Sequence, residues 1–145
     1  MNVRKSITVA RPPEVAFKVF CEEIGKWWPL KEGISFGGER AKDIFIENRV
    51  GGRFFERFTD GTECEVGRVT AYQPPSRVTF TWCPPDWDAT TQVDIRFTAE
   101  GAGTRVELEH SGWEQSAKVE GERGGYDNGW DFVLSRFLAG AGASA

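Results

Sequence analysis

Near its C-terminal end the chain carries an apolar stripe that another part of the molecule must cover. Between positions 126 and 138, apolar and aromatic side chains recur with the period of one helix face. They are Tyr126, Trp130, Val133, Leu134, Phe137 and Leu138. The spacing predicts a helix of about three and a half turns. A helix with so broad an apolar face has to pack on a large apolar surface.

The preceding part of the chain is predicted to supply that surface as an antiparallel sheet. Val and Ile, which favour strands, number 12 and 6 against only 4 Leu. Turn signals such as Asp60-Gly61 and the proline pairs at 74–75 and 84–85 separate short alternating runs. The predicted strands span residues 6–9 (with Val3 in phase), 44–49, 53–58, 63–72, 77–82, 91–100 and 104–111.

Two short helices and a small-residue tail complete the predicted order. The proline pair at 12–13 begins the first helix, and the second carries Ile24, Trp27 and Trp28. Residues 33–38 and 114–125 are predicted loops. Residues 139–145 are a predicted frayed tail, and removing residues 140–145 would cost little stability. Because the chain has no internal repeat and no linker, residues 1–145 are predicted to form one α+β domain.

Charge and composition exclude several classes of function. The net charge of −4 arises from 18 basic and 22 acidic side chains spread along the chain, so no basic patch for nucleic acid is expected. Three distant cysteines and a single histidine give no metal-site pattern. Gly51-Gly52 precedes a strand, which excludes a phosphate-binding loop. No apolar run approaches the roughly 20 residues of a membrane span. We expect a cytoplasmic protein without metal or cofactor.

Five phrases of the sequence resemble a known family. They are Val-Gly-Gly-Arg-Phe at 50–54, Asp-Gly at 60–61, Gly-Arg-Val at 67–69, Pro-Pro-Ser-Arg-Val-Thr-Phe-Thr-Trp at 74–82 and Leu-Glu-His-Ser-Gly-Trp at 108–113. From about residue 3 to residue 138, the chain resembles a branch of the START-like (SRPBCC) superfamily. The members of that branch are homologues of the activator of the 90-kDa heat-shock protein ATPase.

The resemblance implies a helix-grip fold. This is a curved antiparallel sheet of about seven strands around a long C-terminal helix, with two short helices after the first strand and a cavity between sheet and helix. Related domains bind lipids, sterols, polyketides or plant hormones, and a minority are cyclases or dehydratases. The implied partner is therefore a small apolar or amphipathic ligand. The name of the branch adds a stress-response module that contacts a chaperone as an alternative.

Strand parity places Glu56 on an apolar face. Phe54, Glu56 and Phe58 share one side of the predicted strand 53–58, opposite Arg53 and Arg57. A carboxyl group among aromatic rings could bind a polar group of a ligand or move a proton. Alternatively, Glu56 pairs with a neighbouring arginine, or a bulge turns it outward, and we favour this second interpretation.

His110 is the other candidate for chemistry, because it shares the inward face of its strand with Val106 and Leu108. As a general base it would need an orienting partner, and Glu56 is the inward carboxylate that parity offers. We favour the alternative of a structural histidine that bonds to the backbone and packs on Trp113. Glu56 and His110 are accordingly weak catalytic candidates, and a cyclase or dehydratase remains an alternative to a non-enzymatic binding domain.

The aromatic residues are the stronger indication of a binding site. Part of this inventory fills the core, and the other part is predicted to line a concave pocket that holds a few polar groups. The predicted ligand-binding residues are Trp28, Phe36, Phe54, Glu56, Phe80, Trp82, His110, Trp113, Trp130 and Phe137.

Overall fold

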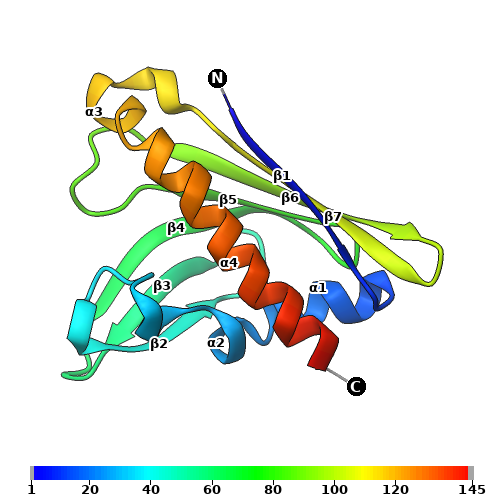
Figure 1. Cartoon of the computed structure of the whole chain (residues 1–145). Helices are drawn as coiled ribbons and strands as arrows, with labels where there is room; N and C mark the ends of the chain where they lie inside the picture. Colours follow the sequence, from blue (N-terminus) through cyan, green and yellow to red (C-terminus); the bar gives the residue numbers. More distant parts are fainter. Residues whose placement is uncertain (1, 144–145) are drawn as a thin grey trace.

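A seven-stranded antiparallel sheet curves around the C-terminal helix in the computed structural model, which describes residues 2–143 (Figure 1). In spatial order the strands run β1-β7-β6-β5-β4-β3-β2, so every neighbouring pair except β1 and β7 is consecutive along the chain. The strands are β1 (Val3–Val9), β2 (Ala41–Ile46), β3 (Arg53–Phe58), β4 (Glu63–Gln73), β5 (Arg77–Trp82), β6 (Thr91–Glu100) and β7 (Gly103–Ser111).

Helices lie on one side of this sheet. Helix α4 crosses the concave face diagonally, and α1 and α2 lie beside its C-terminal half (Figure 1). The helices are α1 (Pro13–Cys21), α2 (Ile24–Trp27), α3 (Ala117–Glu120) and α4 (Arg123–Ala143), with short 3₁₀ turns η1 (Leu30–Glu32), η2 (Gly38–Arg40) and η3 (Trp113–Gln115). This arrangement confirms the predicted helix-grip fold, including the two short helices that follow β1.

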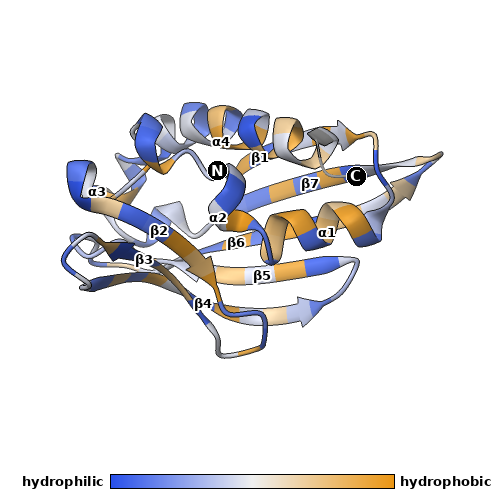
Figure 2. Ribbon diagram, turned by 90° about the horizontal axis from the view of Figure 1, so that it is seen from below, coloured by the Kyte–Doolittle hydropathy of each residue, from blue (hydrophilic) through white to orange (hydrophobic). Residues whose placement is uncertain are grey.

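Alternation along the strands produces the core. In β6, Val93, Ile95 and Phe97 are buried while Gln92 and Arg96 are exposed, and hydrophobic residues alternate with hydrophilic ones along the strands in Figure 2. The predicted stripe of α4 meets this face. Its buried members are Trp130, Val133, Leu134 and Phe137, whereas Leu138 is 40% exposed, contrary to its predicted place in the stripe.

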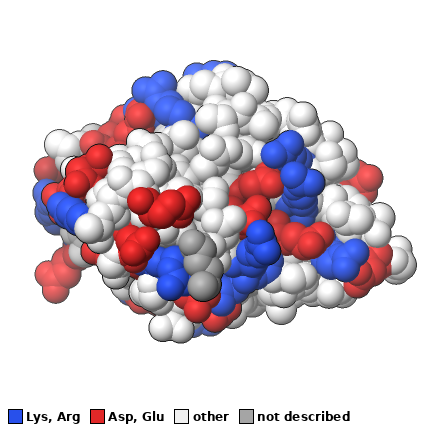
Figure 3. All heavy atoms as spheres, turned by 90° about the horizontal axis from the view of Figure 1, so that it is seen from above, with Lys and Arg blue, Asp and Glu red and all other residues white. Residues whose placement is uncertain are grey.

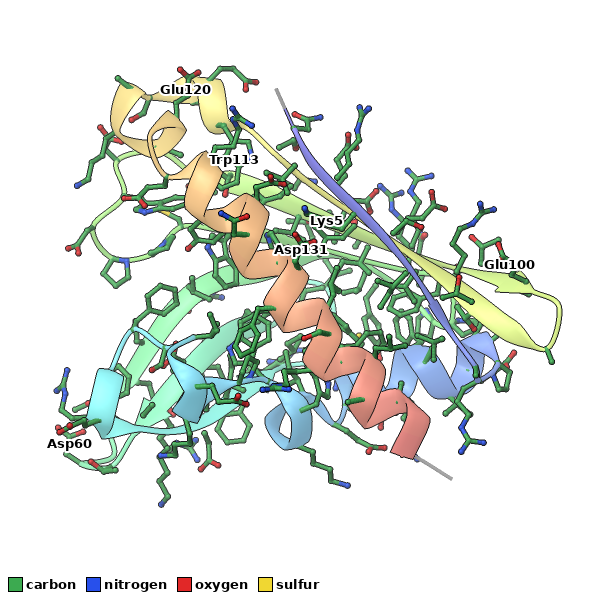
Figure 4. The ribbon with its side chains drawn as sticks, in the orientation of Figure 1. Lys5, Asp60, Glu100, Trp113, Glu120 and Asp131 are labelled. Atoms are coloured by element: carbon green, nitrogen blue, oxygen red, sulfur yellow. The ribbon has the colours of Figure 1, made fainter. Side chains whose placement is uncertain are left out.

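Ion pairs complete the attachment of α4 to the edge of the sheet. The Lys5 ammonium of β1 lies 2.9 Å from Asp127 and 3.1 Å from Asp131, both on α4, and Figure 4 shows Lys5 and Asp131 facing each other. Elsewhere the charges are mixed: basic and acidic side chains are interspersed over the face shown in Figure 3, without a continuous patch of one sign.

Three predicted boundaries are wrong. The strand predicted at 44–49 is β2, Ala41–Ile46, so it begins and ends three residues earlier. Residues 114–125 contain η3, α3 and the first turn of α4 rather than a continuous loop. Ser116 caps α3, because its hydroxyl accepts a hydrogen bond from the Val119 N–H at 3.3 Å. The predicted frayed tail is helical through residue 143, since Ala141 is fully buried and Gly140 packs on Trp27. Residues 144 and 145 lie outside the described part of the chain.

Candidate functional site

A pocket of about 230 Å³ opens between the N-terminal half of α4 and the sheet. Its walls come from the segment 33–36, the side chains of β2, β3 and β5 that face α4, and the end of α2. The volume is below the roughly 300–1,000 Å³ of drug-sized sites, so the pocket suits a fragment-sized molecule. The lining residues are Trp28, Gly33, Ile34, Ser35, Phe36, Ile44, Glu56, Trp82, Glu122, Gly125, Tyr126, Gly129, Trp130 and Val133.

Glu56 of β3 is the buried polar group of this pocket, with 1% of its surface exposed. Its Oε1 accepts a hydrogen bond from the Ser35 hydroxyl at 2.6 Å, and its Oε2 accepts one from the Phe36 N–H at 3.0 Å. Ser35 in turn accepts from the Gly37 N–H at 3.0 Å. Because both carboxylate oxygens act as acceptors, the side chain fixes the segment 35–37 against β3.

Trp82, at the end of β5, is the centre of the aromatic wall. The centroids of four other rings of the pocket lie 6.0–6.3 Å from its own. Those rings belong to Trp28, Phe36, Tyr126 and Trp130. Trp28 also donates a hydrogen bond to the Ile34 carbonyl at 3.1 Å, which ties the segment 33–36 to α2. The pocket is therefore predominantly aromatic, with few polar groups.

Tyr126 adds a hydrogen-bond donor. Its hydroxyl oxygen accepts a hydrogen bond from the Trp82 Nε1–H at 2.9 Å, which leaves the hydroxyl hydrogen to point elsewhere. Burial raises the pKa of Tyr126 to about 12, so the phenol stays protonated at neutral pH. One wall of the pocket thus offers a donor, Tyr126, and another an acceptor, Glu56.

Two glycines keep the α4 side of the pocket open. Gly125 and Gly129 lie on the lining face, one turn apart, and a Cβ at either position would meet no atom within 4 Å. Glycine inside a helix costs about 1 kcal/mol relative to alanine. Glycine at these two positions therefore lowers the stability of the helix and leaves space in the pocket that side chains would otherwise fill.

His110 lies in the core and not in the pocket lining. Its ring is fully buried and takes part in a directed chain of hydrogen bonds. The Trp130 Nε1–H donates to Nδ1 at 3.0 Å, which leaves Nε2 as the protonated nitrogen, 2.7 Å from the Thr91 hydroxyl. Thr91 donates onward to the Trp82 carbonyl at 2.7 Å.

Burial lowers the pKa of His110 to about 3, so this ring is neutral at physiological pH. Both of its nitrogens are occupied by protein groups. The suggested role as a general base oriented by Glu56 is therefore corrected, because the two side chains have separate partners and only Glu56 reaches the pocket. His110 packs on Trp113, as in the structural alternative, but its ring bonds to the side chains of Thr91 and Trp130 and not to the backbone.

The model of the family described as Activator of Hsp90 ATPase homolog 1-like protein matches residues 10–141. The chain belongs to this family. The resemblance of the sequence to homologues of the activator of the heat-shock protein ATPase is thereby confirmed. No curated protein sequence matches significantly.

Three solved structures illustrate the relationship. Protein MLL2253 from Mesorhizobium loti is 20% identical to this chain, with a TM-score of 0.72, and the match covers 97% of this chain and 96% of MLL2253. The Aha1 dimer from Colwellia psychrerythraea is 18% identical with a TM-score of 0.73, covering 99% and 98%. The anthrahydroquino-γ-pyrone synthase Txn09 is 29% identical with a TM-score of 0.61, covering 96% of each chain. The first two comparisons establish the fold alone.

In this member of the activator-homologue family, five of the ten predicted ligand-binding residues line the pocket: Trp28, Phe36, Glu56, Trp82 and Trp130. The other five are fully buried and belong to the core behind its walls. They are Phe54, Phe80, His110, Trp113 and Phe137. Strand and helix periodicity identifies a buried face, but it does not separate the part that faces a pocket from the part covered by helices.

Sequence reasoning identified Phe36 and Trp130 but missed the other pocket residues of the segment 33–36 and of α4. Ser35 gave no signal, because its role depends on a hydrogen bond to Glu56, 21 positions away. Tyr126 belongs to the predicted apolar stripe, and its contact with Trp82 spans 44 positions. Gly125 falls in the predicted loop 114–125, and no site prediction includes Gly129. A helix interior that carries both glycines is the signal that could have indicated an open wall.

Within residues 2–143, no group of three or more side chains is placed to hold a metal ion. Over the same range, no helix is both long and apolar enough to span a membrane. The three cysteines are free thiols, and burial raises the pKa of Cys21 and of Cys64, which disfavours the reactive thiolate.

Proposed function

We propose that this chain is a binding domain for a small, largely apolar molecule held between α4 and the sheet. The observation that carries this proposal is a pocket of about 230 Å³ walled by five aromatic rings, with one buried carboxylate at Glu56. Binding sites for small molecules typically combine apolar walls with a few placed polar groups. The membership in a family with the helix-grip fold supports this proposal, since that fold leaves space between sheet and helix.

The test compares two leucine substitutions within α4. Gly129→Leu adds a side chain to the lining face, while Gly124→Leu adds one at an exposed position outside the lining that also has no atom within 4 Å. A panel of fragment-sized aromatic compounds is screened against the parent by ligand-observed NMR. We expect binders whose affinity falls at least tenfold in Gly129→Leu and stays unchanged in Gly124→Leu. A panel without binders, or equal binding by both variants, would contradict the proposal.

A second candidate function is enzymatic, and one comparison favours it. Txn09, which is described as a synthase, is 29% identical over nearly the whole chain. In the present chain Glu56 could accept a proton from the carbon beside a ligand carbonyl, while the Tyr126 hydroxyl donates its proton to the carbonyl oxygen, which yields an enol. Such a step would precede a condensation or cyclisation.

Proton exchange tests this candidate without knowledge of the natural substrate. The protein is incubated with 1-indanone in D₂O, and the loss of the signal from the protons beside the carbonyl is followed by NMR. Catalysis predicts exchange faster than in buffer, abolished in Glu56→Gln and slowed in Tyr126→Phe. Exchange that is no faster than in buffer would leave the binding function as the better assignment.

The family name also suggests contact with a chaperone. Among residues 2–143 the exposed large hydrophobic side chains are Phe36, Val50 and Leu138, and they lie on different segments. They do not supply the contiguous apolar area that marks a protein interface. Recovery of a chaperone in stoichiometric amount, together with stimulated ATP hydrolysis, would place this function ahead of ligand binding.

A further inference from the structure

The wall of the pocket carries two carboxylates and no basic side chain. Glu56 is buried on the β3 side, and Glu122 is exposed on the α4 side. No Lys, Arg or His belongs to the lining residues. Arg123, which follows Glu122 in the chain, lies outside the lining. The pocket is therefore a site of formal charge −2 with aromatic walls.

The negative charge of Glu56 has no cationic partner among the described residues. Its hydrogen bonds come from neutral donors, the Ser35 hydroxyl and the Phe36 N–H. The neighbouring arginines of β3 lie on the opposite face, where Arg53 and Arg57 pair with Glu63 at 2.8 and 3.0 Å. A buried charge is costly unless it is paired, so a positively charged ligand gains more here than a neutral one.

The aromatic rings of the pocket wall also favour a positively charged ligand. The ring centroids of Trp28, Trp82 and Trp130 are separated by 6.0–6.3 Å, and the planes of Trp28 and Trp130 are almost perpendicular at 88°. All three rings line the pocket, and a cation held against the face of any one of them, within about 6 Å of its centroid, is attracted by the cation–π interaction, which is strongest for tryptophan. Quaternary ammonium groups are bound in this way by cages of several aromatic rings.

We propose that the pocket selects a small organic cation, an aromatic or alkyl ammonium compound, with its charge between Glu56 and the three indole rings. This inference rests on the proposed binding function and specifies the class of ligand. The volume of about 230 Å³ limits the ligand to an ammonium group with about one ring or a short chain attached. Anionic molecules of the same size are excluded by the two carboxylates.

A pair of isosteric probes tests the proposal on the unmodified protein. Phenyltrimethylammonium and tert-butylbenzene have the same shape and differ in one atom, a charged nitrogen in place of carbon. Dissociation constants are measured by quenching of tryptophan fluorescence at low ionic strength. We expect phenyltrimethylammonium to bind at least tenfold more tightly. Equal affinities, or tighter binding of tert-butylbenzene, would overturn the inference while leaving the proposed binding function intact.

Two variants test whether the charge of Glu56 causes the preference for the cationic probe. Glu56→Gln keeps an oxygen acceptor for Ser35 or Phe36. We expect this variant to weaken the binding of phenyltrimethylammonium at least tenfold, with little effect on the binding of tert-butylbenzene. Glu107→Gln removes an exposed charge of β7 far from the lining and should change neither constant. If Glu56→Gln leaves the tenfold preference in place, the inference is overturned. If neither probe binds, it is overturned too, and the fragment panel then decides whether the binding function also falls.

Discussion

At the scale of single residues, His110 is held by hydrogen bonds at both of its ring nitrogens. Its ring is fully buried, accepts from Trp130 and reaches Thr91, whose hydroxyl bonds to the backbone of β5. This chain of hydrogen bonds joins α4 to the ends of β5, β6 and β7. A protonated ring could not accept from Trp130, so the network exists only with neutral histidine.

The first prediction follows from this network and concerns pH. His110 is the only histidine of the chain, so its ring signals can be followed by NMR. Because burial lowers the pKa of His110 to about 3, these signals should not change between pH 8 and pH 5. In the unfolded chain His110 takes up a proton near pH 6.5, whereas in the folded protein it stays neutral until about pH 3. The free energy of unfolding therefore falls as the pH drops from 6.5 towards 3. The loss approaches about 1.4 kcal/mol per pH unit. A midpoint near 6.5 in the folded protein would contradict the network.

At the scale of elements, α4 contains glycines with opposite surroundings. Gly129 faces open space in the pocket wall, whereas a Cβ at Gly140 would lie 2.9 Å from the Cβ of Trp27. The first glycine leaves room for a ligand, and the second allows α4 and α2 to approach closely. The same residue type therefore serves two different purposes within one helix.

These surroundings predict opposite effects of the same substitution. Gly129→Ala should raise the free energy of unfolding by up to about 1 kcal/mol, because alanine is the better helix former and has room. Gly140→Ala should lower it, because the added methyl group pushes against Trp27. Urea unfolding of both variants measures the difference. Stabilisation by Gly140→Ala would mean that α2 and α4 are further apart than described.

The end of α4 gives a third prediction. Truncation after residue 139 removes Ala141, which is fully buried, and uncovers Trp27, which is 6% exposed. We expect a loss on the order of 1 kcal/mol or more, seen as a lower melting temperature, instead of the small effect expected from a frayed tail. Truncation after residue 143 serves as the control. Equal melting temperatures would restore the frayed-tail interpretation.

Local patterns predicted most of the fold and five of the fourteen residues that line the candidate site. The predicted strands 53–58, 77–82 and 91–100 coincide with β3, β5 and β6, because alternation and turn residues are local signals. Parity placed Glu56 inward correctly. The favoured alternative, an arginine pair or an outward-turning bulge, was wrong, because Glu56 is buried and Arg53 and Arg57 pair with Glu63 instead. The contacts of Ser35, Tyr126 and Gly140 were not predicted, because each depends on a partner distant in sequence.

At the scale of the whole molecule, Trp130 joins the three parts that define the fold. It lies on α4, donates to His110 of β7 and packs its ring against Trp28 and Trp82 in the pocket wall. Only 3% of its surface is exposed. The side chain of Trp130 therefore links α4 to the sheet and also forms part of the pocket wall.

The fourth prediction is that Trp130→Ala destabilises the whole protein. Removal of a buried tryptophan costs about 3–5 kcal/mol, a large part of the roughly 5–15 kcal/mol that stabilises a domain. Thermal unfolding followed by circular dichroism measures the loss, with Trp130→Phe as a milder variant that keeps a ring but not the hydrogen bond to His110. An alanine variant that melts with the parent would show that α4 is not packed on the sheet as described.

The pairing of β1 with β7 has a consequence for the order of folding. Strands β2 to β7 follow one another as neighbours, so each of these pairings closes a short stretch of chain, whereas Val3 pairs with His110, 107 positions away. Closing the longer loop carries the larger entropic cost, and distant pairings form slowly. The meander of six strands can therefore assemble as a nucleus, with β1 and the α4 helix docking afterwards on a surface that already exists.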